Sequence, residues 1–156
     1  MKIIMGADFG GYELKEAIKE NLLAQGYDIT DVSPNGPITY QDAAKQVAKG
    51  VQSKEYDRGI AICGTGMGVS IIANKFRGVY AALCECVYTA RRSKTINNTN
   101  VLCMGGFVIG KVLGCEMANA WLKAEHLEGI DPAEKEKCGK ESLEIPKAEE
   151  EAYSQV

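Results

Sequence analysis

Hydrophobic positions along the 156-residue chain follow two alternating patterns. Short apolar runs such as "RGIAIC" are bounded by charged residues or glycine and are typical of strands. Between these runs, apolar residues recur one helical turn apart, as at Leu14, Ile18 and Leu22. The pattern predicts strands at 2–7, 27–32, 58–63, 78–84 and 100–105, and helices at 11–26, 41–53, 69–75, 87–95 and 109–124.

Repeated strand–helix units predict a parallel sheet with right-handed connections. The expected fold class is α/β: a three-layer, doubly wound, Rossmann-like parallel sheet of five strands with helices on both faces. The run at 58–63 is apolar after Arg58, which favours the centre of the sheet. We expect residues 1–125 to form this domain, and the charge-rich residues 126–156 to form an arm or helix of the same domain at a subunit interface.

Composition and charge narrow the class of protein. Hydrophobic content of 46% with 25% charged residues is ordinary for one globular domain. A net charge of -3 argues against a nucleic-acid surface, which needs a basic face. The chain shows no apolar run of membrane-spanning length and no signal-peptide pattern at its start, so we expect a cytoplasmic protein without a membrane partner.

Six cysteines and one histidine show no metal-binding spacing. We therefore expect reduced thiols, no metal and no cofactor. The exception of interest is Cys63, which stands where the central apolar run meets the glycine-rich loop of "CGTGMG". Ligands of parallel α/β sheets bind at the carboxyl ends of the strands. We expect three segments to meet there: Asp8, residues 63–68 and residues 97–106.

The glycine-rich loop fits two structures. A dinucleotide fingerprint would follow the first strand and end in glycine, but position 69 is valine; a phosphate-binding P-loop would need a GKS or GKT sequence. Asp31 only weakly resembles a ribose-binding acid. What remains is either a nest of backbone N–H groups that holds an anion at a helix start, or an ordinary tight turn around a buried cysteine.

A thiol beside a nest favours one chemistry over another. A thiolate can remove a proton next to a carbonyl, and the N–H groups can stabilise the enediolate that forms. A covalent cysteine hydrolase would also use an oxyanion hole, but it normally needs a histidine partner. His126 is the only candidate, and we expect it to be an exposed or capping residue, which disfavours the hydrolase.

Four stretches resemble the type B ribose-5-phosphate isomerase family, which includes the two galactose-6-phosphate isomerase subunits. They are "MKIIMGADFGGYELK", "DRGIAICGTGMGVSIIANKFRGVYAAL", "NNTNVLCMGG" and "ANAWL", in family order over residues 1–125. The resemblance implies metal-free aldose–ketose isomerisation of a phosphorylated sugar through a cis-enediol. It also implies a homodimer or homotetramer with the active site between subunits.

Site roles follow from the resemblance position by position. Cys63 matches the base, Asp8 an acid that holds substrate hydroxyls, and Tyr40 an active-site tyrosine. The nest that stabilises the enediolate, assisted by Asn97, matches Gly64, Thr65, Gly66, Met67 and Gly68.

Several family side chains are replaced. Phe9 and Ile96 stand where the family usually has histidines, the second of which opens the sugar ring, and Phe107 stands for an arginine. The late Gly-Gly-Arg-His segment, whose basic residues hold the phosphate, is also missing. Arg91 and Arg92 could instead grip the phosphate, or form an exposed basic helix turn.

Three interpretations of these replacements stay open. The preferred one is a four-carbon 4-phosphate of the erythrose or erythrulose type, which cannot form a five-membered ring. The second is a ribose-5-phosphate or galactose-6-phosphate isomerase, acting with a hetero-subunit that supplies the missing groups. The third is a non-catalytic sugar-phosphate-binding or regulatory subunit, although retention of Cys63 argues against it.

Overall fold

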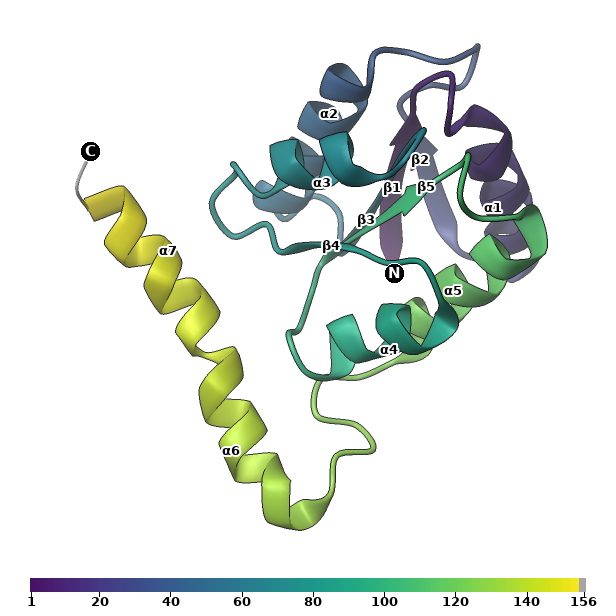
Figure 1. The fold of residues 1–156 in the computed structure, drawn as a ribbon. Coiled ribbons are helices and arrows are strands. Elements are labelled where there is room, and N and C mark those ends of the chain that lie inside the picture. The colour runs from purple at the N-terminus through teal and green to yellow at the C-terminus, as the bar shows by residue number, and fades with distance from the viewer. Residues whose placement is uncertain (155–156) are drawn as a thin grey trace.

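A computed structural model describes residues 1–154 and shows one parallel five-stranded sheet (Figure 1). The strand order is β2-β1-β3-β5-β4. The strands are β1 (Lys2–Ala7), β2 (Asp28–Asp31), β3 (Arg58–Cys63), β4 (Ala81–Leu83) and β5 (Val101–Gly105). The central position predicted for 58–63 is confirmed, with Ile62 paired to Ala7 on one side and to Met104 on the other.

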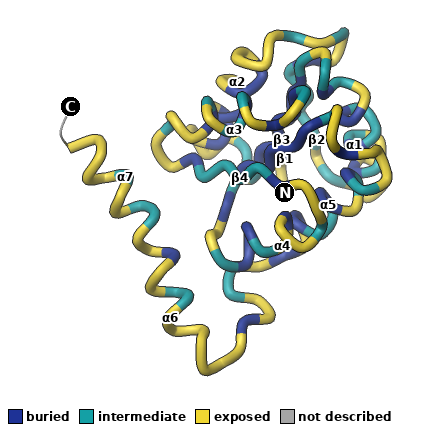
Figure 2. Tube along the Cα trace, viewed as in Figure 1, coloured by how far each residue is buried: buried dark blue, intermediate teal, exposed yellow. Residues whose placement is uncertain are grey.

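Helices cover both faces of the sheet, which confirms the predicted fold class (Figure 1). On one face lie α1 (Tyr12–Ala24), α4 (Val87–Thr95) and α5 (Lys111–Lys123); on the other lie α2 (Tyr40–Gln52) and α3 (Met67–Ala73). Side chains alternate across each strand, so each face of the sheet has its own hydrophobic core. Ile62 packs in the core under α1, α4 and α5, and Cys63 packs in the core under α2 and α3. The three inner strands, β1, β3 and β5, are the buried centre of the molecule (Figure 2).

Most predicted boundaries shift by one or two residues, and two of the differences have clear local reasons. The strand expected at 78–84 is shortened at its start, because Gly78 turns with a φ of 73° and the strand begins only at Ala81. The helix expected from Val69 begins at Met67, directly after Gly66. The glycine loop is therefore shorter than the sequence indicated, and its last two residues belong to the helix.

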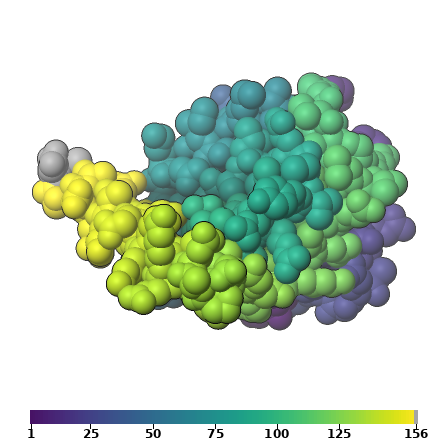
Figure 3. All heavy atoms as spheres, turned by 60° about the horizontal axis from the view of Figure 1, so that its bottom comes forward, coloured from purple at the N-terminus to yellow at the C-terminus, as the bar shows by residue number. Residues whose placement is uncertain are grey.

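The C-terminal arm consists of α6 (Pro132–Ser142) and α7 (Glu144–Ser154), which lie at one side of the rounded body and project beyond it (Figures 1 and 3). A few polar contacts tie α7 to the body. The Glu149 carboxylate accepts hydrogen bonds from the Gly78 N–H at 2.9 and 3.0 Å, and the Tyr153 ring lies 4.8 Å from the Arg77 guanidinium. The prediction that this arm lies at a subunit interface stays a prediction.

None of the helices in residues 1–154 has the length and apolarity needed to cross a membrane. The cytoplasmic location expected from the sequence stays a prediction.

Candidate active site

Three turns meet at the carboxyl edge of the sheet, the edge at which the parallel strands end. They follow β1, β3 and β5 and comprise residues 8–11, 64–66 and 106–108. Backbone hydrogen bonds hold them together: Gly106 N–H donates to the Cys63 carbonyl at 2.8 Å, and Phe107 N–H donates to the Gly64 carbonyl at 2.9 Å. Asp8 N–H donates to the carbonyl of Ile62 at 3.2 Å. The segments after Ala7 and Cys63 are thus brought together, as predicted.

Cys63 is the last residue of the central strand and is 5% exposed. Its Sγ accepts a hydrogen bond from the Gly66 N–H at 3.1 Å, so the loop folds back over the sulfur. The Gly66 N–H is thus a main-chain donor in direct contact with this sulfur. Cys103, from β5 in the same core, is fully buried, and burial raises the pKa of its thiol well above the usual range. Only Cys63 of this pair lies beside the glycine loop.

The shape of the loop depends on two glycines. Gly66 has a φ of 77°, and a Cβ there would stand 2.7 Å from the Met104 carbonyl carbon. At Gly106, a Cβ would collide with the backbone carbonyl of Gly10. These positions need glycine because the three turns approach one another backbone to backbone. The result is a surface lined by main-chain groups beside the Cys63 thiol.

Aromatic side chains form the walls of this surface. The Phe107 ring lies over Gly64, 2.9 Å from where a Cβ would stand, and the Tyr40 ring lies 2.7 Å from the corresponding point of Gly68. Phe107 is 74% exposed and Phe9, on the turn after β1, is 81% exposed. The predicted Tyr40 and Phe9 therefore do lie at this edge, on the turns or helices next to the nest.

Polar groups at this edge are few. The Asp8 carboxylate accepts the Gly11 N–H at 3.1 Å, which fixes the turn and leaves its second oxygen out of that contact. Thr65 is exposed, and its hydroxyl accepts the Met67 N–H at 3.4 Å. Asp8 is the only charged residue in the three turns. A substrate anion therefore finds no basic side chain within them.

Asn97 lies far from the three turns, before the opposite end of β5. It precedes the first residue of β5, whereas Cys63 pairs with Gly105, the last residue of that strand. The two ends of β5 are four residues apart, and at about 3.3 Å per residue they are separated by roughly 13 Å. The expectation that residues 97–106 lie together at the carboxyl edge was wrong for 97–100, because β5 runs from one edge of the sheet to the other.

Arg91 and Arg92 are also remote from the three turns. Both lie on α4, and Arg91 pairs with Glu128 at 3.7 Å in a groove between α4 and α5. His126 follows α5, which runs back from the carboxyl edge, and Leu127 beside it bonds to the end of α4. No cysteine–histidine pair forms at Cys63, which agrees with the argument against a hydrolase.

No set of three or more His, Cys, Asp or Glu side chains within residues 1–154 is placed to hold a metal ion. All six cysteines are free thiols.

A buried charged network supports the turn after β1, and the sequence did not reveal it. Lys15 on α1 is fully buried, pairs with Asp31 at 2.7 Å and donates to the Ser33 carbonyl at 2.7 Å. The Ser33 hydroxyl in turn accepts the Ala7 N–H at 3.1 Å, one residue before Asp8. Asp31 is thus a structural ion-pair partner and not a ribose-binding acid.

A free thiol, main-chain N–H donors and a carboxylate at one sheet edge define the class of site. It can remove a proton next to a carbonyl and hold the oxyanion that results. These are the requirements of an isomerase that works on hydroxy-carbonyl compounds.

Comparison with known proteins gives the family. The family model described as Ribose/Galactose Isomerase matches residues 3–138. The 4-deoxy-4-sulfo-D-erythrose isomerase of Clostridium sp. (strain MSTE9) is 46% identical over 84% of each chain. The D-erythrulose-4-phosphate isomerase of Pectobacterium atrosepticum is 40% identical, over 89% of this chain and 93% of the relative.

A solved structure, Clostridium thermocellum ribose-5-phosphate isomerase B, superposes with a TM-score of 0.87 and 40% identity, covering 97% of this chain and 99% of its own. The chain belongs to the ribose/galactose isomerase family. The prediction of a sugar-phosphate isomerase is thereby confirmed at the level of the family, as is the resemblance that led to it.

Proposed function

We propose that the chain interconverts a four-carbon aldose and ketose that carry an anionic group, phosphate or sulfonate, on the last carbon. The observation that carries the proposal is the pair of exposed aromatic side chains, Phe9 and Phe107, beside the Cys63 loop. In the proposed enzyme, these rings take up space beside the nest that a longer sugar would need. Two relatives, at 46% and 40% identity, are named for four-carbon substrates with such groups.

The proposed chemistry uses the geometry of the nest. The Cys63 thiolate removes a proton from the carbon next to the carbonyl, and the electron pair moves onto the carbonyl oxygen to give a cis-enediolate. N–H groups of residues 64–68 stabilise that oxygen. The thiol then returns the proton to the neighbouring carbon, while the hydroxyl proton passes between the two oxygens. Asp8 holds substrate hydroxyls through its carboxylate.

A four-carbon substrate explains the replaced side chains. With its last carbon blocked by phosphate or sulfonate, such a sugar has no free hydroxyl that can close a five-membered ring. A ring-opening group is then unnecessary, which fits Ile96. The space that a fifth carbon would need is available for the Phe107 ring.

We further propose that a second copy of the chain completes the site. Asn97 is too far from Cys63 within one chain, and Asp8 is the only charge in the three turns. The exposed apolar side chains of Phe9, Met67 and Phe107 offer a surface that a second copy would cover. In this arrangement, the partner brings Asn97 and a cation for the anionic group.

The substrate proposal is tested by kcat/KM of the purified, singly expressed protein. The panel contains erythrose 4-phosphate, 4-deoxy-4-sulfo-erythrose, ribose 5-phosphate and galactose 6-phosphate. We expect one four-carbon substrate to exceed both longer sugars by about 100-fold or more, the scale on which a shaped pocket discriminates. A longer sugar that reacts best would overturn the proposal. Binding without turnover on the whole panel would favour a regulatory subunit.

The shared site is tested by subunit mixing. Cys63→Ala and Asn97→Ala chains are each expected to be inactive, and co-expression should restore about a quarter of wild-type activity in a dimer, because half the dimers are mixed and each of these has one intact site. Purified mixed oligomers without activity would contradict sharing, and an active Asn97→Ala protein would refute the role of Asn97. Activity that appears only with a different protein chain would point to a hetero-subunit.

A further inference from the structure

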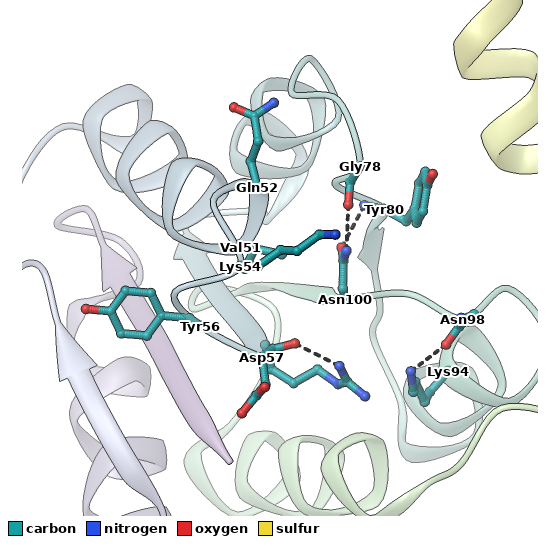
Figure 4. Close-up of a pocket in the computed structure, with 11 residues that line it drawn as sticks. Val51, Gln52, Lys54, Tyr56, Asp57, Gly78, Tyr80, Lys94, Asn98 and Asn100 are labelled. Atoms are coloured by element: carbon teal, nitrogen blue, oxygen red, sulfur yellow. Dashed lines mark hydrogen bonds between the residues drawn. The ribbon is translucent and has the colours of Figure 1, made fainter.

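A second cavity lies at the amino edge of the sheet, where the strands begin, opposite the Cys63 loop. Its volume is about 420 Å³, within the range of roughly 300–1,000 Å³ that is usual for small-molecule sites. Four segments line it: the end of α2, the start of β3, the turn before β4, and the end of α4 with the loop to β5 (Figure 4). The proposed isomerase mechanism uses none of these residues.

Three cationic side chains line this cavity: Lys54, Arg58 and Lys94. Among the described residues, none of the three has a carboxylate within salt-bridge distance. Asp57 is the one acid in the lining, and it accepts the Lys2 N–H at 2.7 Å. The cavity therefore holds an excess of positive charge.

Lys94 is the most buried of these cations, with 4% of its surface exposed. Its ammonium donates to the Asn98 side-chain oxygen at 2.5 Å, as Figure 4 shows. Burial, and then the positive charge of Arg58, lower the pKa of Lys94 to about 8, against a smaller opposing effect of Glu125. A buried cation beside another cation is costly unless an anion neutralises it.

Arg58 has an unused donor. One of its terminal nitrogens donates to the Asp57 carbonyl at 2.7 Å, while its Nε is buried and has no partner among residues 1–154. Buried polar groups are normally paired, so an orphan guanidinium N–H on a residue that lines a cavity indicates a missing acceptor. Arginine and lysine together, with the Asn98 amide, are a donor set suited to a tetrahedral oxyanion.

We propose that this cavity binds a phosphoryl group, either as inorganic phosphate or as the monoester of a small molecule. The site lies at the opposite edge of the sheet from Cys63 and does not depend on the proposed substrate. Bound phosphate would join Arg58 on β3 to Lys94 and Asn98 beside β5. Because Asn98 follows Asn97, the ligand would also fix the segment that carries Asn97.

Calorimetric titration of the full-length protein with inorganic phosphate, and separately with glycerol phosphate, tests the site. Arg58→Gln should weaken binding at this site about tenfold or more, the loss expected for one charge-assisted contact. Lys45→Gln removes one exposed positive charge from α2 and should bind like wild type. Equal affinity in the wild-type and Arg58→Gln proteins would overturn the proposal. Glycerol phosphate binding tenfold tighter than phosphate would identify a monoester as the ligand, and similar affinities would identify free phosphate.

Two further readouts separate this cavity from the active site. Phosphate should shift the backbone amide NMR signals of Gly59 and Asn98 in the wild type and not in Arg58→Gln; shifts confined to residues 64–68 would overturn the proposal. Measured without added phosphate and with the four-carbon sulfonate as substrate, isomerase turnover should be unchanged in Arg58→Gln, so the substrate proposal can fail or succeed independently.

The pH dependence of anion binding provides a third test. Sulfate keeps its charge between about pH 7 and 9.5, so a change in its binding reports the protein. Protonated Lys94 is present below its pKa of about 8, and binding should weaken as the pH rises through that value. The other charged or titratable groups in the lining are Lys54, Asp57, Arg58, Tyr56 and Tyr80. Sulfate binding that does not change across this range would contradict a role for Lys94.

Discussion

The two edges of the sheet present ligands with opposite kinds of surface. At the carboxyl edge, glycine turns bring main-chain N–H groups next to Cys63, and Asp8 is the only charge in the turns. At the amino edge, Lys54, Arg58 and Lys94 line a cavity without a paired carboxylate in the described chain. A nest of N–H groups is fixed by the backbone, so it is suited to a charge that appears only during a reaction. Cationic side chains carry a full charge, so they are suited to an anionic group that is already there.

The largest expected effect on activity comes from removing the Cys63 sulfur. Cys63→Ala removes the proposed base and should lower kcat by roughly 10²- to 10⁴-fold, the usual contribution of a positioned acid–base group. KM should change little, because the N–H groups that bind the substrate remain. Steady-state kinetics on the best four-carbon substrate measure both. A large rise in KM with kcat unchanged would make Cys63 a binding group and not a base.

The next effect concerns the shape of the nest. Gly66→Ala adds a Cβ 2.7 Å from the Met104 carbonyl carbon at a φ of 77°. The loop must move, and a displacement of about 1 Å costs on the order of 100-fold in rate. Gly26→Ala is the matched control, because Gly26 has a φ of 82° but open space around it. Equal turnover in the two variants would show that loop shape is unimportant.

The buried ion pair between Lys15 and Asp31, beneath the carboxyl edge, should contribute to the unfolding free energy. Lys15→Met leaves Asp31, whose side chain is 8% exposed, with only the partly exposed Lys19 as its ion-pair partner. Breaking a buried ion pair typically costs about 3–5 kcal/mol of unfolding free energy, and because Lys19 remains we expect a loss of about 2–3 kcal/mol. Chemical denaturation measures the change, with Lys111→Met as control, since the Lys111–Glu13 pair is exposed. A loss below about 1 kcal/mol, the value of a surface pair, would contradict this role.

The same network predicts a small pH effect. Burial alone would raise the pKa of Asp31, but hydrogen bonds from Lys15 and Lys19 outweigh it and lower the pKa below 3.8. Burial alone would lower the pKa of Lys19, but hydrogen bonds to Asp31 and Glu16 raise it above 10.5. The contribution of Asp31 is therefore complete above about pH 4 and is lost as the pH falls through its folded-state pKa. That of Lys19 is complete below about pH 10.5 and is lost above it. Denaturation of wild type and Asp31→Asn should converge in acid, and a constant difference would contradict the linkage.

The sequence predicted the carboxyl edge well because its residues are contiguous. "CGTGMG" carries the thiol and the nest in six successive residues, and strand periodicity places them at a strand end. Asn97 was misplaced because the family resemblance assigned it to the Cys63 site, although the strand predicted at 100–105 already put it before the amino end of β5. The cationic cavity could not be predicted from the sequence. Arg58 and Lys94 are 36 residues apart, and only the fold brings them together.

The most direct test of the account is proton NMR in D2O with four-carbon, five-carbon and six-carbon sugar phosphates and the four-carbon sulfonate. The account predicts rapid deuterium incorporation next to the carbonyl of a four-carbon substrate with wild-type protein. It predicts none with folded Cys63→Ala. Exchange that persists in Cys63→Ala, or that appears only with the longer sugars, would contradict the account.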